Sequence, residues 1–265
     1  MSKHLKILSE FCEKNSCDFA ALFLQGSQNY ELDEYSDEYQ SDVDTKAIII
    51  PSLQNIIDGT SPISTTLVTD DNEHIDVKDI RIWIQMWEKQ NISYLEVLFT
   101  NFFLVRDEYL DLIERLQLNA DRISRFNETA TLKCMVGMVR EKMHALKHPY
   151  PSALEKIEKF GYDPKQLHHI CRLMELTQRY INGESLHSAL VPDGKDYLMK
   201  LKKGIEPGES VDYIANQWAS ATENIVDTYI SSHPTNIDSG VKTILYDIKS
   251  EMIRRYIKSL LLKED

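Results

Sequence analysis

Two aspartates, Asp42 and Asp44, lie at the start of a segment rich in β-branched residues, 43–50. The composition of this segment predicts a strand, and the two-residue period of a strand would place both carboxylates on one face, one pleat apart. Carboxylates at that spacing can share a divalent cation, because Mg²⁺ is bound in proteins through oxygen ligands. The pair therefore predicts metal-assisted chemistry on a phosphate, although a D-x-D pattern also occurs in solvated turns.

A Gly-Ser pair ends the preceding apolar run, DFAALFLQ, which predicts a buried strand over residues 18–25. Gly26 would let the backbone approach a phosphate closely. Ser27 would cap a short helix and donate its hydroxyl group to the β or γ phosphate of a nucleotide. The loop between the two strands thus has the residues of a phosphate cradle.

A third carboxylate, Asp76, lies in EHIDVKDI, where Ile75 and Val77 alternate with Asp76 and Lys78. This alternation predicts a strand with one apolar and one charged face. Two-ion transfer of a nucleotidyl group needs charge neutralised on the attacking oxygen, the phosphorus and the leaving pyrophosphate. Asp76 could complete the metal site and orient the attacking hydroxyl group. The alternative is that Asp76 pairs with Lys78 or Lys46, while Asp79 caps the following helix.

This combination of G-S, D-x-D at a strand start and a later lone carboxylate resembles the nucleotidyltransferases of the polymerase-β superfamily. The string GSQNY...SDVDTKAIIIPS is similar to a branch of small bacterial and phage nucleotidyltransferases associated with RNA repair. IDVKDIR, KHPYPS and IEKFGYDPKQLHHICRL extend the resemblance over roughly residues 20–175. The chain departs from these relatives at Glu31, where they usually have Gly, and in an acidic insertion, ELDEYSDEYQ.

The resemblance implies that Gly26 and Ser27 bind phosphate and that Asp42, Asp44 and Asp76 hold Mg²⁺ or Mn²⁺ and are catalytic. The reaction would move an NMP from a nucleoside triphosphate to an acceptor hydroxyl group and release pyrophosphate. An RNA 3′ end is the first choice of acceptor, and a tRNA is the first choice of RNA. Transfer to a protein or a small molecule, or a non-catalytic nucleotide-binding module, are the alternatives.

Three further polar residues, Lys165, His168 and Arg172, recur at spacings of three and four in a segment with helical periodicity. That spacing places them on one face of the helix, where they could together meet a triphosphate. The alternative is a solvated basic face.

The elements that must position these residues change character near residue 106. Residues 1–106 alternate between strand and helix patterns, whereas residues 107–265 are helical almost throughout. This predicts an α+β protein with a mixed-sheet nucleotidyltransferase core, 1–106, followed by an all-helical domain, 107–265, and an active site in the cleft between them.

Charge and composition limit the classes of partner. Of the net charge of −12, residues 1–105 contribute seven basic against 18 acidic side chains, so polyphosphate can bind there only together with cations. The same balance argues against binding to long DNA.

Apolar runs are too short to cross a bilayer, and we expect a cytoplasmic protein without membrane association. The four cysteines form no C-x-x-C pair and are expected to be free thiols. The acidic residues Glu31, Asp33, Glu34, Asp37 and Glu38 could form a lid or a solvated loop.

Overall fold

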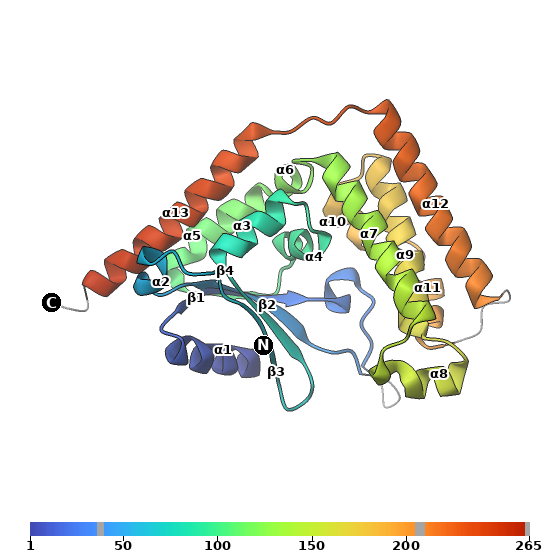
Figure 1. Ribbon diagram of the computed structural model, residues 1–265, viewed down its shortest axis with the longest axis horizontal. Helices are drawn as coiled ribbons and strands as arrows, with labels where there is room; N and C mark the ends of the chain where they lie inside the picture. Colours follow the sequence, from blue (N-terminus) through green and yellow to red (C-terminus); the bar gives the residue numbers. More distant parts are fainter. Residues whose placement is uncertain (36–39, 205–209, 263–265) are drawn as a thin grey trace. The chain divides into compact units, whose positions relative to one another are not determined.

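A mixed five-stranded sheet organises the first of two units in the computed structural model, which describes residues 1–35, 40–204 and 210–262 (Figure 1). The strands lie in the order β3-β4-β2-β1-β5, and all neighbours are antiparallel except β2 and β4, which are parallel. Their bounds are β1 Asp18–Gln25, β2 Asp44–Ile50, β3 Ser64–Val68, β4 His74–Asp79 and β5 Phe103–Val105. The predicted α+β fold with a mixed sheet is therefore confirmed.

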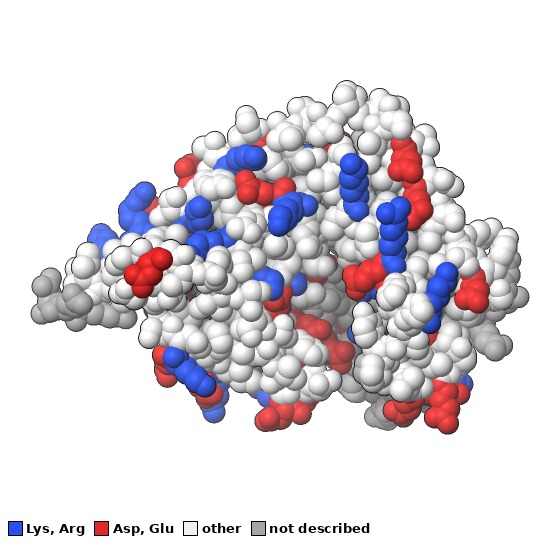
Figure 2. Space-filling model, viewed as in Figure 1, with Lys and Arg blue, Asp and Glu red and all other residues white. Residues whose placement is uncertain are grey.

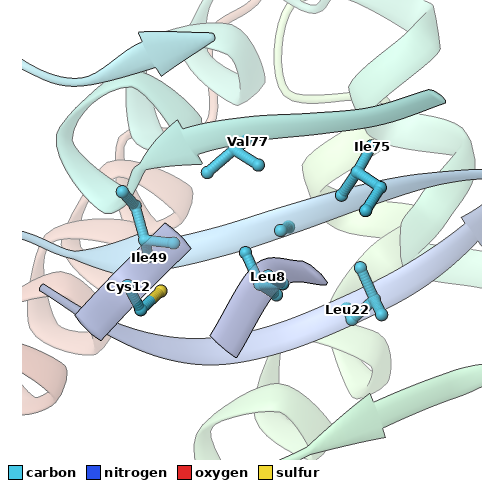
Figure 3. Packing of buried hydrophobic residues seen from close by; sticks show 7 residues of the cluster. Leu8, Cys12, Leu22, Ile49, Ile75 and Val77 are labelled. Atoms are coloured by element: carbon cyan, nitrogen blue, oxygen red, sulfur yellow. The ribbon is translucent and has the colours of Figure 1, made fainter. Parts of the chain in front are cut away.

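Helix α1, Ser2–Lys14, covers one face of this sheet (Figure 1). Figure 3 shows the core beneath it, where Leu8 and Cys12 of α1 meet apolar side chains of the three central strands. The fully buried strand members of this cluster are Leu22, Ala47, Ile49, Ile75 and Val77. Burying each aliphatic side chain of this size contributes roughly 1.5–3 kcal/mol. The apolar residues of β2 and β4 therefore fix which faces of these strands point to the core.

The opposite face of the sheet is covered by α3, Ile80–Glu88, and by α13, Ser239–Leu261. Trp83 of α3 is fully buried and donates its indole N–H to the carbonyl oxygen of Ala47, 3.0 Å away. Its ring also meets the ring of Tyr94 edge to face at 5.0 Å. The hydrogen bond thus anchors α3 to β2, and the ring contact anchors α3 to α4.

The remaining helices of this unit follow the strands in the chain. They are α2 Leu53–Ile57, α4 Ile92–Leu95, α5 Leu110–Leu118 and α6 Ala120–Ser124, with 3₁₀ turns η1 Ser27–Tyr30, η2 Glu96–Phe99 and η3 Asp107–Tyr109. Residues 1–29, 33–126 and 237–265 form this unit, so 107–126 and α13 pack with the sheet. The boundary predicted at residue 106 does not coincide with this division, because helical periodicity does not reveal which surface a helix buries.

The second unit is helical and comprises residues 30–32 and 127–236. Its long helices α7, α9 and α12 pack on one another, and α10 and α11 pack on α9. The bounds are α7 Glu128–Lys147, η4 Pro151–Ala153, α8 Leu154–Phe160, α9 Pro164–Ile181, α10 Leu186–Leu190, α11 Lys195–Lys202 and α12 Val211–Ser232. Most of α9 is buried, which makes it the central helix of the unit.

Charged side chains of both signs are interspersed on the face of the molecule drawn in Figure 2. Among the described residues, no helix combines the length and the apolar character needed to cross a membrane.

Candidate active site

The Gly-Ser turn follows the last residue of β1. Gly26 has a φ of +105°, a left-handed conformation that strains residues with a Cβ atom. Its carbonyl oxygen accepts the backbone N–H of Asn29 at 3.0 Å, and the Asn29 side chain donates to the carbonyl oxygen of Leu24 at 2.9 Å. Ser27 is the first residue of the 3₁₀ turn η1, rather than the cap before a helix that the sequence predicted. The positive φ at position 26 therefore favours glycine, independently of any ligand.

The aspartate pair lies beside this turn. Asp44 opens β2 directly opposite Gln25, the residue before Gly26, and the Gln28 side chain donates to the carbonyl oxygen of Asp42 at 2.8 Å. Asp42 is exposed, and the Asp44 side chain retains 38% of its accessible surface. One oxygen of Asp44, Oδ1, accepts the backbone N–H of His74 at 2.9 Å. The D-x-D segment and the Gly-Ser turn thus lie at the same end of the paired strands β1 and β2. Asp42 precedes the first residue of β2, so it does not share a strand face with Asp44 as the two-residue spacing predicted.

Asp76 lies on the same face of the sheet as Asp44. Strands β2 and β4 are parallel, and Lys46 lies opposite Asp76. Asp44 is two residues before Lys46 in β2, so its side chain points to the same face of the sheet. The Asp76 carboxylate accepts the Tyr94 hydroxyl group at 2.6 Å and the Lys46 ammonium group at 3.2 Å, and Lys78 Nζ lies 2.8 Å from its other oxygen. The alternative interpretation of Asp76, as a partner of Lys46 or Lys78, is therefore what the structure shows.

Electrostatics around Asp76 favour its charged form. Burial by itself would raise the pKa of Asp76, but the charges of Lys46 and Lys78 and the hydrogen bond from Tyr94 outweigh burial and lower it. The pKa of Tyr94 is raised by burial and by the neighbouring carboxylate. Lys46 also lies 4.2 Å from the centre of the Tyr94 ring. Tyr94 belongs to this cluster although it is 18 residues from Asp76, and no sequence pattern connects the two.

Asp79, the other acidic candidate on β4, has a structural role. It is fully buried, its Oδ1 atom accepts the backbone N–H of Arg81 at 2.8 Å, and it forms an ion pair with the Arg81 guanidinium group. The predicted capping of α3 by Asp79 is confirmed. Asp76 therefore remains the candidate for the third carboxylate.

A divalent metal fits this site only in part. Asp42 and Asp44 offer the accessible carboxylate oxygens that Mg²⁺ prefers. Both oxygens of Asp76, in contrast, already face donors, so Asp76 could bind a metal only by exchanging an ammonium partner for it. Within residues 1–35, 40–204 and 210–262, no group of three His, Cys, Asp or Glu side chains lies close enough together to hold a metal ion.

The basic residues predicted to meet a triphosphate lie on α9 and differ in exposure. Lys165 is exposed, whereas His168 is buried and its Nδ1–H group donates to the carbonyl oxygen of Leu198 at 2.9 Å. Burial lowers the pKa of His168 to about 4, so the ring is neutral at pH 7. The three residues therefore do not form one exposed basic face, because that stripe of α9 points into the helical unit.

Arg172 is buried with unsatisfied donors. It retains 6% of its accessible surface, and its guanidinium carbon lies 4.2 Å from the centre of the Tyr30 ring. Its Nε and Nη1 groups make no hydrogen bond to any residue that the structure describes. A buried cation without hydrogen-bond acceptors is costly, and a cation–π contact offsets only part of that cost. Arg172 is thus a candidate for binding an anion.

The first two residues of the acidic insertion, Glu31 and Leu32, contact helix α11. Lys202 donates to the carbonyl oxygen of Leu32 at 2.7 Å, and Glu31 forms an ion pair with Lys195. Asp33 is exposed and Glu34 is half-buried. Asp37 and Glu38 lie outside the described residues, so a lid remains a prediction. The described part of the insertion is attached to α11 by its first residues.

The likeness of this chain to known proteins is confined to solved structures. The chain matches no protein-family model and no curated protein. Among solved structures, it is similar to the crystal structure of a nucleotidyltransferase-like protein from Exiguobacterium sibiricum 255-15. The two chains are 11% identical with a TM-score of 0.26, and the match covers 85% of this chain and 73% of that chain. A likeness this distant assigns no function.

Proposed function

We propose that the chain is a metal-dependent nucleotidyltransferase of the polymerase-β type, which moves an NMP from a nucleoside triphosphate to an acceptor hydroxyl group. One observation carries the proposal. The Gly26–Ser27 turn and the Asp42–Asp44 pair lie at the same end of the neighbouring strands β1 and β2. Asp76, on the adjacent parallel strand β4, lies on the same face of the sheet as Asp44. This arrangement brings a glycine-containing turn and accessible carboxylates together.

In this proposal Asp42 and Asp44 hold Mg²⁺ or Mn²⁺ through their accessible oxygens. When bound, the metal would neutralise charge on the triphosphate and on the departing pyrophosphate. Asp76 is proposed as the third carboxylate, which would orient the acceptor hydroxyl group and take up its proton. Its lowered pKa keeps Asp76 ionised and therefore able to accept a hydrogen bond.

The remaining residues would bind the nucleotide. The backbone of Gly26 and the Ser27 hydroxyl group are proposed to contact its phosphates. Lys165, which is exposed, and Arg172, which has unbonded donors, would contribute positive charge from α9. His168 is neutral and bonded to Leu198, so its contribution would be to hold α9 and α11 together.

An RNA 3′ end, with tRNA as first choice, is the proposed acceptor. Support comes from the resemblance of residues 20–175 to the nucleotidyltransferases associated with RNA repair. A protein or small-molecule acceptor is the alternative, and the acidic composition of residues 1–105 is compatible with it because such acceptors carry fewer phosphates.

The test is transfer from each of the four α-³²P-labelled NTPs to total RNA, purified tRNA and total protein, with Mg²⁺, with Mn²⁺ or with EDTA. We expect labelled RNA, pyrophosphate release and no reaction in EDTA. Asp42→Asn and Asp44→Asn should each lower the rate at least about 100-fold, as removal of an electrostatic stabiliser typically does. The matched control is Asp70→Asn, which changes an exposed aspartate of the β3–β4 turn. Wild-type rates in both site variants would overturn the proposal.

A non-catalytic nucleotide-binding module is a second candidate, favoured by the ion pairs of Asp76 with Lys46 and Lys78. In such a module the two lysines would neutralise the sheet face without metal. Calorimetry with a non-hydrolysable NTP distinguishes the candidates. Binding that is the same with Mg²⁺ and with EDTA, together with no pyrophosphate release, supports the module, whereas Mg²⁺-dependent binding supports the transferase.

A further inference from the structure

Two of the four cysteines lie at the junction of α1 and β1, at the end of the sheet unit's first helix. Cys12 is in the last turn of α1 and Cys17 immediately precedes β1. The sequence offers no C-x-x-C signature here, since four residues separate the two cysteines. Nothing in the proposed nucleotidyl transfer uses either thiol.

The backbone of this junction brings the two cysteines together. The N–H group of Cys17 donates to the carbonyl oxygen of Cys12 at 3.0 Å, and the N–H group of Ser16 donates to that of Glu13 at 3.3 Å. Ser16 has a φ of +52°. These two bonds with a left-handed residue between them define a Schellman motif, in which the side chains three residues before and two residues after the helix cap pack against each other. Those two positions are occupied by Cys12 and Cys17.

The separation suits a disulfide. The hydrogen bond between the Cys17 nitrogen and the Cys12 oxygen limits the distance between the two α-carbons to about 7 Å, near the upper end of the range that disulfides span. The two thiols also affect each other, since interaction with Cys17 raises the pKa of Cys12 and interaction with Cys12 lowers the pKa of Cys17. A short movement of the side chains would complete the bond.

The two thiols differ in access and in acidity. Cys12 retains 5% of its accessible surface and packs beside Leu8 and Ile49 in the core (Figure 3), whereas Cys17 is half-buried. The hydrogen bond from Cys12 lowers the pKa of Cys17, while burial and the charges of Asp18 and Asp79 act in the opposite direction. Thiolates, and not thiols, are the reacting species in disulfide exchange. Cys17 is thus the sulfur that an external reagent would meet first.

We propose that Cys12 and Cys17 form a reversible disulfide that joins the end of α1 to the start of β1, with a small-molecule disulfide such as oxidised glutathione as the oxidant. The Cys17 thiolate attacks one sulfur of the oxidant, and a mixed disulfide forms as a thiolate leaves. Cys12 then loses its proton and attacks the Cys17 sulfur, and the second thiolate leaves. The protein gives up two electrons and two protons, and the oxidant becomes two thiols.

Proteolysis gives a direct test, because trypsin cuts after Lys6, Lys14 and Lys46 and so separates the two cysteines into peptides 7–14 and 15–46. The reduced full-length chain is incubated with oxidised glutathione, blocked with iodoacetamide, digested and measured by mass spectrometry. We expect the two peptides to appear linked in more than half of the protein, and the protein to remain a monomer on a non-reducing gel. Reduction should restore the separate peptides.

Single substitutions separate the two roles. Cys12→Ser should stop the reaction at the mixed disulfide on Cys17, and Cys17→Ser should leave Cys12 reduced. In the reduced chain, iodoacetamide should alkylate Cys17 at least about tenfold faster than Cys12. Unlinked peptides in the wild-type chain, a lasting mixed disulfide on wild-type Cys17, or linkage between two chains would each overturn the proposal. Cys171, which is buried and whose pKa burial raises to about 12, is the internal reference for an unreactive thiol.

Discussion

Two groups of polar residues, one on the sheet and one on helix α9, differ in how their charges are balanced. On the sheet, the Asp76 carboxylate is surrounded by two ammonium groups and a hydroxyl group. On α9, His168 is kept neutral by burial, and Arg172 retains a charge with two unbonded donors. The sheet group is balanced internally, whereas the helix group, within the described residues, contains a guanidinium group with two buried N–H groups that lack an acceptor.

This difference indicates where a ligand would act. A carboxylate that is already paired contributes to stability first, and it can bind a metal only by giving up a partner. The Asp44 carboxylate retains 38% of its accessible surface although one oxygen accepts the His74 N–H group, and two N–H groups of Arg172 have no hydrogen-bond partner among the described residues, so both side chains can gain from a ligand. Stability and ligand-binding measurements on the same variants therefore test the comparison.

The largest effect on stability is expected at Asp76. Asp76→Ala leaves Lys46, whose side chain is 6% exposed, without its carboxylate, so the free energy of unfolding should fall by about 3 kcal/mol. Asp44→Ala removes an aspartate that is 38% exposed and should cost less than about 1 kcal/mol. Urea unfolding at pH 7, followed by circular dichroism, measures both. Equal losses in the two variants would show that the two carboxylates are not distinguished by pairing.

The next effect is a pH dependence that comes from His168. Its pKa is about 4 in the folded chain and about 6.5 in an unfolded one, so the unfolded chain binds more protons between these values. Its contribution to stability is complete above pH 6.5 and is lost as the pH falls toward 4, by about 2 kcal/mol between pH 7 and pH 5. His168→Asn retains a donor for Leu198 but cannot titrate.

The measurement is urea unfolding of both proteins at pH 7 and pH 5. The wild-type chain should lose about 2 kcal/mol more than His168→Asn over this interval. The neighbouring His169, whose pKa burial also lowers, is present in both proteins and cancels in the difference. Parallel losses in the two proteins would mean that His168 is protonated to the same extent before and after unfolding.

A smaller effect is expected from Tyr94→Phe, which removes the hydroxyl group that donates to Asp76 at 2.6 Å. Hydrogen bonds to charged groups contribute about 1.5–3 kcal/mol, and because Lys46 and Lys78 remain in place we expect a loss of about 1.5 kcal/mol in urea unfolding. Tyr150→Phe changes an exposed tyrosine and is the control. A loss no greater than that of the control would contradict the proposed balance around Asp76.

The smallest effect on stability, and a clear effect on binding, is expected from Arg172→Met. Removing a buried cation, two of whose N–H groups lack an acceptor among the described residues, should change the free energy of unfolding by less than about 1 kcal/mol, because the lost contact with Tyr30 offsets the relieved desolvation. Affinity for a non-hydrolysable NTP, measured by calorimetry, should fall at least about tenfold. Unchanged affinity, or a large loss of stability, would show that Arg172 is a structural residue. Lys147→Met, which changes an exposed lysine at the end of α7, is the control.

Local patterns predicted much of the sheet and of the site beside it. Because side chains alternate along a strand, the run after Asp44 and the Ile75–Val77 alternation were enough to predict β2, β4 and the charged face of β4 that carries Asp76. The predicted cap at Asp79 was confirmed for a similar reason, since a cap and its helix are adjacent in the chain.

The sequence alone therefore determined the α+β class and the strands that carry Asp44 and Asp76, which depend on short-range periodicity, whereas the pairing of β1 with β2 brought the Gly-Ser turn beside Asp44. Only the tertiary structure decided that Tyr94 joins Asp76, that α13 packs on the sheet, and that His168 is buried. The physical reason is that a helical stripe of polar residues looks the same whether it faces water or a neighbouring helix. Packing between residues distant in the chain decides which of these two environments such a stripe occupies.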